Sequence, residues 1–375
     1  MTLSLSDHRH VHFVGIGGIG MSALARVLLA RGYTVSGSDH AAGEQTDALQ
    51  ALGATIHIGH SAGCIEGADL VITTPAAGSA SDVAAARAAG ITIVRRAEIL
   101  GAVTNPGRGI AVAGTHGKST TSGLIGHIAA EAGLDPTVLV GGVVSNFGSN
   151  ARLGASDLVI VEADEFDAAF LELYPDIAVI TSVEPEHLDY FGTVECMENA
   201  FRQFARQVTG TLIICADDAP VGDIARGVSM EVISYGIDQG DWRAWRIEER
   251  GRTTTFCAGD GTFEGEFTMS LAGAHNVRNA LAALAVARTL DISLDVAASA
   301  LASFTGIGRR FETMGEVAGV LVMDDYAHHP TEIRRTLAAL SNRFGRPIRL
   351  AFQPHTYSRT SAFLDDFGDA FADAE

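Results

Sequence analysis

The stretch Gly109–Thr121, GIAVAGTHGKSTT, decides which fold the rest of the sequence predicts. Its apolar run Ile110–Ala113 is typical of a buried strand, and the glycine turn Gly114–Gly117 leads into a helical pattern that opens at Lys118. A strand, a glycine turn and a helix start form a phosphate cradle, because backbone N–H groups at a helix N-terminus point unpaired at an incoming anion. Val112 stands where the usual phosphate-loop pattern has its first glycine. The stretch therefore predicts a site for a nucleoside triphosphate.

Lys118 is the only lysine among the 26 lysine and arginine residues of the chain. Everywhere else arginine supplies the positive charge, so a lone lysine here indicates a position where arginine cannot replace it. In such a cradle we expect Lys118 to reach the β- and γ-phosphates and the Ser119 hydroxyl to bind Mg²⁺. The residues of the predicted cradle are Gly114, Thr115, His116, Gly117, Lys118, Ser119 and Thr120.

Length and composition predict a globular α/β protein of two or three domains, with 375 residues, 47% hydrophobic content and 42 glycines. No apolar run is long enough to span a membrane, and the first ten residues lack an apolar signal core, so we expect a cytoplasmic protein without a membrane partner. A net charge of −19 argues against sequence-independent binding of nucleic acid. The cysteines are scattered and read as reduced structural thiols: Cys64, Cys196, Cys215 and Cys257.

The N-terminal segment carries a second glycine pattern. An apolar strand, Val11–Ile16, overlaps the pattern Gly15-x-Gly17-x-x-Gly20, and a helix, Met21–Ala30, and a strand ending near Asp39 follow. This context is typical of a dinucleotide-binding fingerprint, in which an acid about twenty residues on binds ribose hydroxyls. The alternative is a tight turn without a ligand. The further strands predicted for a doubly wound domain are Thr55–Ile58, Leu70–Thr73 and Ile91–Val94.

Acidic clusters follow two further predicted strands. Asp157–Val161 leads into EADEFD, and Ile177–Val183 leads into EPEHLDY. Ligands of parallel α/β sheets lie at the carboxyl ends of the strands, so we expect both clusters beside the phosphate cradle, with Glu162 and His187 as Mg²⁺ ligands. The alternative is that the acids of EADEFD are solvated loop residues, and we favour that alternative for Asp167.

The rest of the central region is less regular. Gly141–Gly154 is rich in glycine and asparagine and predicts a loop, whereas Trp242–Leu271 alternates and predicts antiparallel strands. A long helix is expected from Gly273 to Leu290. It presents Asn276 and Asn279 on one face, where their amides suit a purine edge, although Asn276 alone is also a good helix N-cap.

A third unit follows the segment Phe304–Glu312, FTGIGRRFE, which we predict to be a hinge. The expected elements are a strand at Val320–Met323, a helix at Thr331–Leu340 and a strand at Ile348–Phe352. Two strands do not make a doubly wound sheet, so we predict an incomplete third domain.

Nine motifs, in order, resemble the Mur ligases, and most nearly the alanine-adding branch of that family: HFVGIGGIGMSALA, SGSD, GTHGKST, EADEFD, EPEHLDY, HNVRNALAA, GIGRRFE, DDYAHHPTE and QPHTYSRT. The resemblance implies a three-domain α/β architecture. Its parts are a Rossmann-like UDP-sugar-binding domain (1–105), a central P-loop ATPase-like ATP-binding domain (106–308) and an incomplete Rossmann-like C-terminal amino-acid-binding domain (309–375).

The resemblance also implies an activity: ATP- and Mg²⁺-dependent ligation of L-alanine to UDP-N-acetylmuramate through an acyl phosphate, in cytoplasmic peptidoglycan precursor synthesis. Some branches of the family use a carbamylated lysine beside Mg²⁺. This chain has no lysine besides Lys118 to carry such a group, which agrees with the alanine-adding branch.

Carried over by motif, the resemblance assigns site residues to each ligand. ATP would contact the cradle and also Asn276, Asn279, Arg310 and Asp325. Mg²⁺ would be held by Ser119, Glu162 and His187. The substrates would lie near Gly15, Gly17, Gly18, Ile19, Gly20, Ser38, Asp39, His329, His355 and Arg359. The implied catalytic residues are Lys118, His187, Arg310, His355 and Arg359, with the base left open between His187 and His355.

Three alternatives stay open at this stage. The tripeptide-adding murein-peptide ligases share both nucleotide motifs. A nicotinamide-dependent oxidoreductase fits the first fingerprint alone, but hydride transfer needs no second phosphate site. A non-catalytic UDP-sugar-binding protein fits the short third domain, and for that reason we expect the chain to bind UDP-N-acetylmuramate but to ligate weakly or not at all alone. The sequence does not indicate an oligomeric state.

Overall fold

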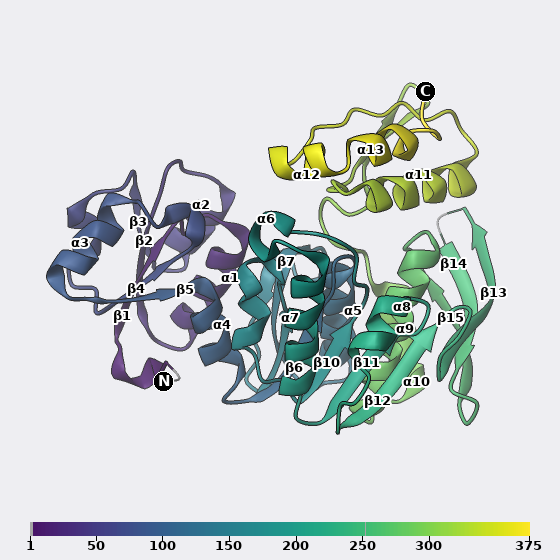
Figure 1. The fold of residues 1–375 in the computed structure, drawn as a ribbon, viewed down its shortest axis with the longest axis horizontal. Helices are drawn as coiled ribbons and strands as arrows, with labels where there is room; N and C mark the ends of the chain where they lie inside the picture. The colour runs from purple at the N-terminus through teal and green to yellow at the C-terminus, as the bar shows by residue number, and fades with distance from the viewer. Residues whose placement is uncertain (1–2, 252) are drawn as a thin grey trace.

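The computed structural model describes residues 3–251 and 253–375, and Figure 1 shows the arrangement of their elements. The described residues form three sheets: an N-terminal sheet of five strands, a central sheet of ten and a hairpin of two. The N-terminal sheet lies beside one end of the central sheet, and the C-terminal segment lies above it (Figure 1). The α/β fold class predicted from the sequence is confirmed.

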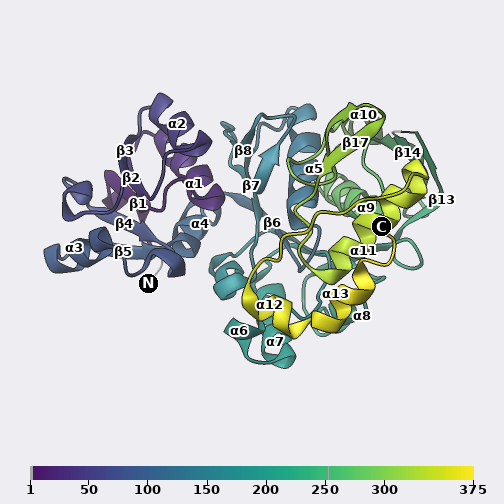
Figure 2. The same cartoon turned by 90° about the horizontal axis from the view of Figure 1, so that it is seen from above.

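The N-terminal sheet is parallel throughout, in the order β3-β2-β1-β4-β5. Helices lie on both of its faces, as Figure 2 shows from above, so it is doubly wound as predicted. Its strands are β1 (His10–Val14), β2 (Thr34–Asp39), β3 (Thr55–Ile58), β4 (Leu70–Thr73) and β5 (Thr92–Arg95). Its helices are α1 (Ile19–Ala30), α2 (Glu44–Ala51), α3 (Ser81–Ala89) and α4 (Arg96–Thr104).

The central sheet has the order β15-β14-β13-β12-β11-β10-β6-β9-β7-β8. The pairs from β7 to β13 are parallel, and β8, β14 and β15 add antiparallel strands at the two ends. The first five strands along the chain are β6 (Arg108–Ala113), β7 (Thr137–Val144), β8 (Ser149–Arg152), β9 (Leu158–Glu162) and β10 (Ile177–Ile180). The others are β11 (Thr211–Cys215), β12 (Glu231–Gly236), β13 (Trp242–Arg250), β14 (Thr253–Gly259) and β15 (Glu264–Met269).

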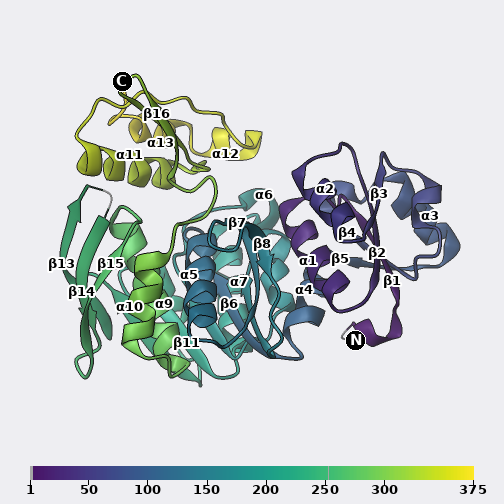
Figure 3. The same ribbon diagram turned by 180° about the vertical axis from the view of Figure 1, so that it is seen from behind.

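Helices cover both faces of the central sheet. Figure 1 shows α7 and α8 on one face, and Figure 3, from behind, shows α5, α9 and α10 on the other. Alternate residues of β6 point to the two layers, with Ile110 and Val112 on the α9 side and Ala111 and Ala113 on the α7 side. The helices are α5 (Lys118–Glu131), α6 (Leu188–Phe191), α7 (Val194–Gln207), α8 (Ala219–Ile224), α9 (Ala274–Thr289) and α10 (Leu294–Ser303).

The C-terminal segment holds an antiparallel hairpin and three helices, two of which, α11 and α13, form a small apolar core. The elements are β16 (Glu312–Val317), β17 (Val320–Asp324), α11 (Pro330–Phe344), α12 (Tyr357–Ala362) and α13 (Leu364–Ala370). Short 3-10 helices elsewhere in the described chain are η1 (Leu5–Asp7), η2 (Ala62–Ile65), η3 (Pro75–Ala77) and η4 (Phe166–Glu172). No helix among the described residues is long and apolar enough to cross a membrane.

Two predicted elements are wrong. Gly141–Gly154 is not a loop, because most of it belongs to the antiparallel pair β7 and β8, which packs against α1. The predicted strand Ile348–Phe352 pairs with no described strand. Its apolar run instead supplies Ile348 and Phe352 to the small core around α11 and α13, so the apolar residues reflect packing rather than a ladder.

The burial of α9 generates a stability prediction. Leu284 is fully buried between α9 and the central sheet, so Leu284→Ala removes apolar contacts and leaves a cavity. We expect it to lower the free energy of unfolding of the central region by about 2–5 kcal/mol in urea denaturation. Leu153→Ala is the matched control, because Leu153 is 43% exposed. An equal loss from both variants would contradict the packing described.

Candidate active site

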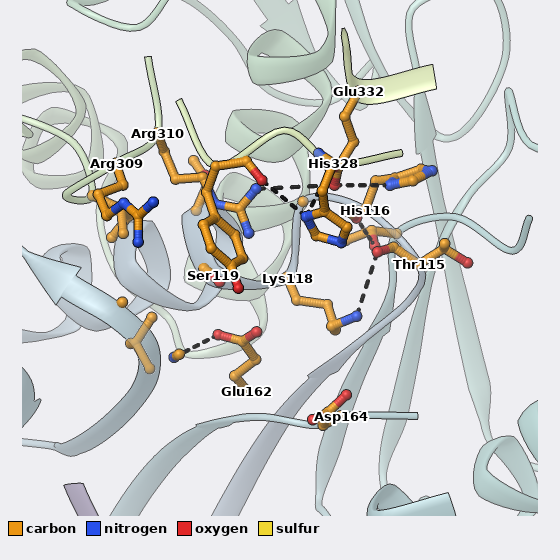
Figure 4. A pocket seen from close by; sticks show the side chains of 18 of the residues that line it. Thr115, His116, Lys118, Ser119, Glu162, Asp164, Arg309, Arg310, His328 and Glu332 are labelled. Carbon is orange, nitrogen blue, oxygen red and sulfur yellow. Dashed lines mark hydrogen bonds and ion pairs between the residues drawn. The ribbon is translucent and has the colours of Figure 1, made fainter. Parts of the chain in front are cut away.

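A cleft of about 1300 Å³ lies between the three parts of the molecule, with the phosphate cradle in its wall. Figure 4 shows Lys118, Ser119 and Glu162 near one another in this cleft, below Arg310 and Glu332. The order β10-β6-β9 explains the convergence, because the loops after three neighbouring parallel strands leave the same edge of the sheet. Most predicted site residues line it: Gly18, Ile19, Gly20, Thr115, His116, Gly117, Lys118, Ser119, Thr120, Glu162, His187, Asn276, Asn279, Arg310, Asp325, His355 and Arg359.

The turn before α5 needs both of its glycines. Gly114 and Gly117 have φ values of 131° and 82°, where a side chain is strained. A Cβ at Gly114 would lie 2.2 Å from Thr181 Oγ1, and one at Gly117 would lie 2.5 Å from Asn279 Oδ1. The turn is therefore packed tightly between the β10 loop and α9.

Only part of the turn is available to a phosphate. The N–H groups of Thr115 and His116 already donate to Ser182 O and Ser182 Oγ, at 2.9 and 3.1 Å. The first amides of α5, from Lys118 onward, have no partner earlier in the helix, and no side chain caps them. The amides that remain for the predicted phosphate are thus those at the start of α5, whereas Thr115 and His116 hold the turn in place.

Lys118 is held by two short contacts. Its Nζ lies 2.6 Å from Gly114 O and 2.6 Å from Glu165 Oε2, and its side chain is 13% exposed. Burial opposes the charge of Lys118, but Glu165 and the other nearby carboxylates outweigh burial and raise its pKa. Lys118 is therefore an ammonium ion that Glu165 positions at the cradle.

The burial of Glu165 contradicts the alternative that the acids of EADEFD are all solvated loop residues. Its side chain is 1% exposed and also lies 4.0 Å from His187 Nε2. Asp164 forms an ion pair with Arg96 at 3.3 Å, across to the N-terminal region. Asp167 lies outside the cleft lining, is 23% exposed and lies 3.8 Å from Arg95, so it is paired rather than simply solvated, and its lack of a functional role stays a prediction. Glu165 was missed because its partner is 47 residues away in the chain.

The predicted Mg²⁺ ligands have chemistry that fits the ion. Glu162 ends β9, and its carboxylate accepts a 2.7 Å hydrogen bond from Gly141 N, which fixes its orientation. His187 caps α6 in a left-handed conformation, and burial lowers its pKa, so its imidazole is neutral. With the Ser119 hydroxyl, these groups offer two oxygen donors and one imidazole to an ion that keeps several waters. Their role as ligands stays a prediction.

Asn276 and Asn279 lie one helical turn apart at the cleft end of α9. The helix begins at Ala274 after Gly273, so the alternative that Asn276 is the N-cap is wrong. Asn276 Nδ2 donates to Ala272 O at 2.7 Å, and Asn279 Nδ2 donates to Asn276 Oδ1 at 3.0 Å. The two amides are ordered beside Gly117, but base recognition by them stays a prediction.

The C-terminal segment brings Arg310 and Asp325 to the cleft. Arg310 lies 5.4 Å from the Tyr326 ring and 3.9 Å from Glu332 Oε1. Asp325 accepts 2.7 Å hydrogen bonds from Phe311 N and Ala327 N, and burial raises its pKa. Asp325 therefore fastens the predicted hinge segment to the end of β17.

Arg359 and His355 lie together, and His329 does not join them. Arg359 Nε donates to Glu186 Oε1 at 3.0 Å, and its NH1 group donates to His355 Nδ1 at 3.1 Å. His329 is buried outside the cleft lining, where its Nδ1 accepts from Thr331 N and caps α11. Glu186 belongs to the motif EPEHLDY but was not predicted as a site residue, because its partner is 173 residues away.

The predicted UDP-sugar residues divide between two places. Gly18, Ile19 and Gly20 face the main cleft, whereas Gly15, Gly17 and Asp39 line a smaller pocket of about 480 Å³ that also reaches Gly18. Asp39 Oδ2 accepts from Gly17 N at 2.8 Å, which ties the acid to the glycine turn. Ser38 is fully buried and donates to Asp82, so its side chain faces neither pocket.

Comparison with family models covers most of the chain. A model described as the Mur ligase family, catalytic domain, matches residues 10–108, and the Mur ligase middle domain matches residues 112–287. The model described as the Mur ligase, glutamate ligase domain, matches residues 309–375.

Whole-chain relatives agree with these models. The chain is 44% identical to the UDP-N-acetylmuramate–L-alanine ligase of Geotalea daltonii over 97% of this chain and 81% of that protein. It is 46% identical to the ligase of the same name from Salinibacter ruber, over 99% of this chain and 80% of that protein.

Two solved structures share the architecture. UDP-N-acetylmuramate-alanine ligase from Thermotoga maritima has a TM-score of 0.87 and 30% identity, over 98% of this chain and 84% of that one. A murein peptide ligase from Psychrobacter arcticus has a TM-score of 0.78 and 30% identity, over 93% and 79%. The predicted three-part architecture is thereby confirmed, whereas its boundaries at 105/106 and 308/309 stay predictions.

The contacts of Lys118 generate a prediction about nucleotide binding. A planar guanidinium does not fit the two 2.6 Å contacts of the ammonium group, so Lys118→Arg misplaces the charge. We expect the affinity for a non-hydrolysable ATP analogue to fall at least about tenfold in calorimetry, as for loss of a charge-assisted hydrogen bond. Arg202→Lys on α7, in a partly exposed ion pair, is the control and should bind normally. Unchanged binding by Lys118→Arg would contradict the assignment.

The Glu186–Arg359 pair generates a prediction about pH. Burial opposes ionisation of Glu186, but Arg359 outweighs it and lowers the pKa of Glu186. A carboxyl group with a lower pKa in the folded state stabilises the fold above its unfolded pKa, and that stability is lost as the pH falls through the folded pKa. Glu186→Gln should therefore lower the thermal midpoint at about pH 7, and the difference from wild type should shrink towards about pH 3. The same difference at both pH values would count against the ion pair.

Proposed function

The chain belongs to the Mur ligase family, and we propose that it joins L-alanine to UDP-N-acetylmuramate with ATP as the phosphoryl donor. It is an ATP-dependent amide ligase of peptidoglycan precursor synthesis. The observation that carries the choice of substrates is the 44% and 46% identity, over 97% and 99% of the chain, to relatives named for that reaction. The cleft agrees with it, because one cavity joins the phosphate cradle, the start of α1 and the C-terminal segment.

The reaction explains why the cleft needs two cationic side chains. A carboxylate is a poor electrophile, so the lactyl carboxylate of the UDP-sugar first takes the γ-phosphoryl group of ATP, giving an acyl phosphate and ADP. Lys118 and Arg310, from opposite sides of the cleft, neutralise the charge of the transferred group. The amine of L-alanine then attacks the acyl carbon and phosphate leaves.

The attacking amine must first lose a proton. His187 and His355 are the candidate bases. Arg359 donates a hydrogen bond to His355 Nδ1 in this structure, so that lone pair is occupied while the two residues are in contact. Burial lowers the pKa of His187, which leaves its imidazole neutral at neutral pH. A neutral imidazole has one available lone pair, so His187 is the base only where that lone pair is not bound to Mg²⁺.

We propose Ser119, Glu162 and His187 as the residues that would hold Mg²⁺. When bound, the ion would neutralise phosphate charge beside Lys118. The fit rests on the carboxylate of Glu162, oriented by Gly141 N, and on the neutral imidazole of His187. We also propose the cytoplasm as the location, because ATP is one of the substrates.

Release of ADP, measured with each amino acceptor in turn, tests the proposal. We expect release to require UDP-N-acetylmuramate, Mg²⁺ and L-alanine together, and Lys118→Ala to reduce it by at least about 100-fold. The same assay measures the rate of ligation. That this chain alone ligates weakly stays a prediction.

Two outcomes would contradict the proposal. Release that depends on the recovered tripeptide rather than on L-alanine would favour a murein-peptide ligase. Binding of UDP-N-acetylmuramate without ADP release from any acceptor would favour a binding protein.

A further inference from the structure

A network of side chains links the phosphate cradle to helix α11. His116, 7% exposed, turns its imidazole away from Lys118 and towards the C-terminal segment (Figure 4). Its Nδ1 lies 3.1 Å from Glu332 Oε1, and its Nε2 lies 3.4 Å from Glu184 Oε2. One residue of the phosphate turn thus touches a carboxylate of the central region and a carboxylate of α11.

We propose that His116 is a positioning residue that couples nucleotide binding in the cradle to docking of α11 and, through Glu332, to the placement of Arg310. The proposal rests on the proposed function only in naming ATP as the nucleotide.

Glu332 connects two residues of the C-terminal segment, His328 and Arg310. Its Oε2 accepts from His328 N at 3.1 Å at the start of α11, and its Oε1 lies 3.9 Å from Arg310. Burial opposes ionisation of Glu332, but His116, His328 and Arg310 outweigh it and hold the pKa of Glu332 well below its usual range. A shift of the His116 ring therefore acts on the helix start and on Arg310 together.

Glu184 completes the network from the central sheet. Its Oε2 accepts from Thr331 Oγ1 at 2.7 Å, and its Oε1 lies 3.3 Å from Arg335, both on α11. Its backbone N–H donates to Thr115 Oγ1 at 2.9 Å, which fastens it to the phosphate turn. The loop after β10, the turn and α11 therefore form one connected set.

The charges place His116 at the centre of this set. Two carboxylates, 25% and 14% exposed, lie on either side of one imidazole. Burial opposes protonation of His116, but Glu184 and Glu332 outweigh it and raise the pKa of His116. Without that cation each carboxylate keeps only its arginine: Arg335 lies 3.3 Å from Glu184, and Arg310 lies 3.9 Å from Glu332.

The position of His116 supplies the coupling. Gly117 follows it directly, and α5 then presents its free amides to the phosphates. A nucleotide that orders the turn also orders the imidazole and so favours the docked α11. The nucleotide raises the equilibrium constant for docking of α11 by some factor. By linkage, the docked α11 must raise the affinity for the nucleotide by that same factor.

A metal ion is the competing interpretation of this cluster. His116, Glu184 and His329 place one ligand atom each within 4.8 Å of one another, a donor set that suits zinc. The Nδ1 atom of each histidine is occupied, because His329 Nδ1 accepts from Thr331 N and His116 Nδ1 is paired with Glu332. A metal would therefore bind at the two Nε2 atoms, which have no hydrogen-bond partner among the described residues. We favour the ionic network because His116 Nε2 already lies 3.4 Å from Glu184 Oε2, and the zinc content of the purified protein decides between the two.

Amide hydrogen exchange with and without Mg²⁺ and adenylyl imidodiphosphate tests the coupling without turnover. In the wild type we expect the nucleotide to slow exchange in both α5 and α11. In His116→Gln we expect the slowing in α5 to remain and the slowing in α11 to disappear. Loss of protection in α11 already in the nucleotide-free variant, or an unchanged nucleotide effect, would overturn the proposal.

A double-mutant cycle on the dissociation constant of the same analogue gives a second, independent readout. We expect Glu332→Gln to weaken binding by about fivefold or more in the wild type and to have little effect in His116→Gln. Glu316→Gln is the matched control, because Glu316 pairs with Arg346 on the exposed face of the same segment.

Additive effects would overturn the proposal, as would stoichiometric zinc in the purified protein that His329→Gln abolishes. The ADP-release assay can fail while hydrogen exchange and binding still show the coupling. Failure of the proposed ligation is therefore distinguishable from failure of the coupling by His116.

Discussion

The position of β6 between β10 and β9 is the constraint on which the rest of the structure depends. Parallel ladders align Ala113 with Ile180 and Val112 with Glu162, so the three strands end at nearly the same level. The phosphate turn, Glu162 and the loop that carries Glu184, Glu186 and His187 must then meet at one edge. The contacts of Lys118 with Glu165 and of Thr115 with Glu184 depend on that register.

Sequence patterns predicted this edge because its features are local. Strands buried on both faces are short continuous apolar runs, and Gly114 and Gly117 are required by positive φ in the turn itself. The same logic failed at Gly141–Gly154, where glycine was taken as the mark of a loop. There a Cβ at Gly141 would lie 2.8 Å from Glu162, and one at Gly142 would lie 2.7 Å from Ile307. Those glycines allow the strand to pack closely against its neighbours. The local sequence does not distinguish a glycine needed for close packing from a glycine needed for a turn.

The acids of the site were only partly predictable, because their partners are distant in the chain. Glu162 was identified from its place at a strand end, yet Glu165 in the same motif is the residue that binds Lys118. Glu184 and Glu186 flank one proline, and each is neutralised by the C-terminal segment, through Arg335 and Arg359. Neighbouring acids thus have different partners, which the tertiary fold alone assigns.

The charge of the chain gives these pairs their importance. A protein with net charge −19 binds a polyanion only where its own carboxylates are already neutralised. Four acids around the cradle each have a cation: Asp164 has Arg96, Glu165 has Lys118, Glu184 has Arg335 and Glu186 has Arg359. A triphosphate bound as proposed competes with Glu165 for Lys118, and the other neighbour of Glu165, His187 at 4.0 Å, is neutral because burial lowers its pKa. In the proposed nucleotide site, phosphate and the buried Glu165 therefore share Lys118, which makes this ion pair the centre of the electrostatics of the site.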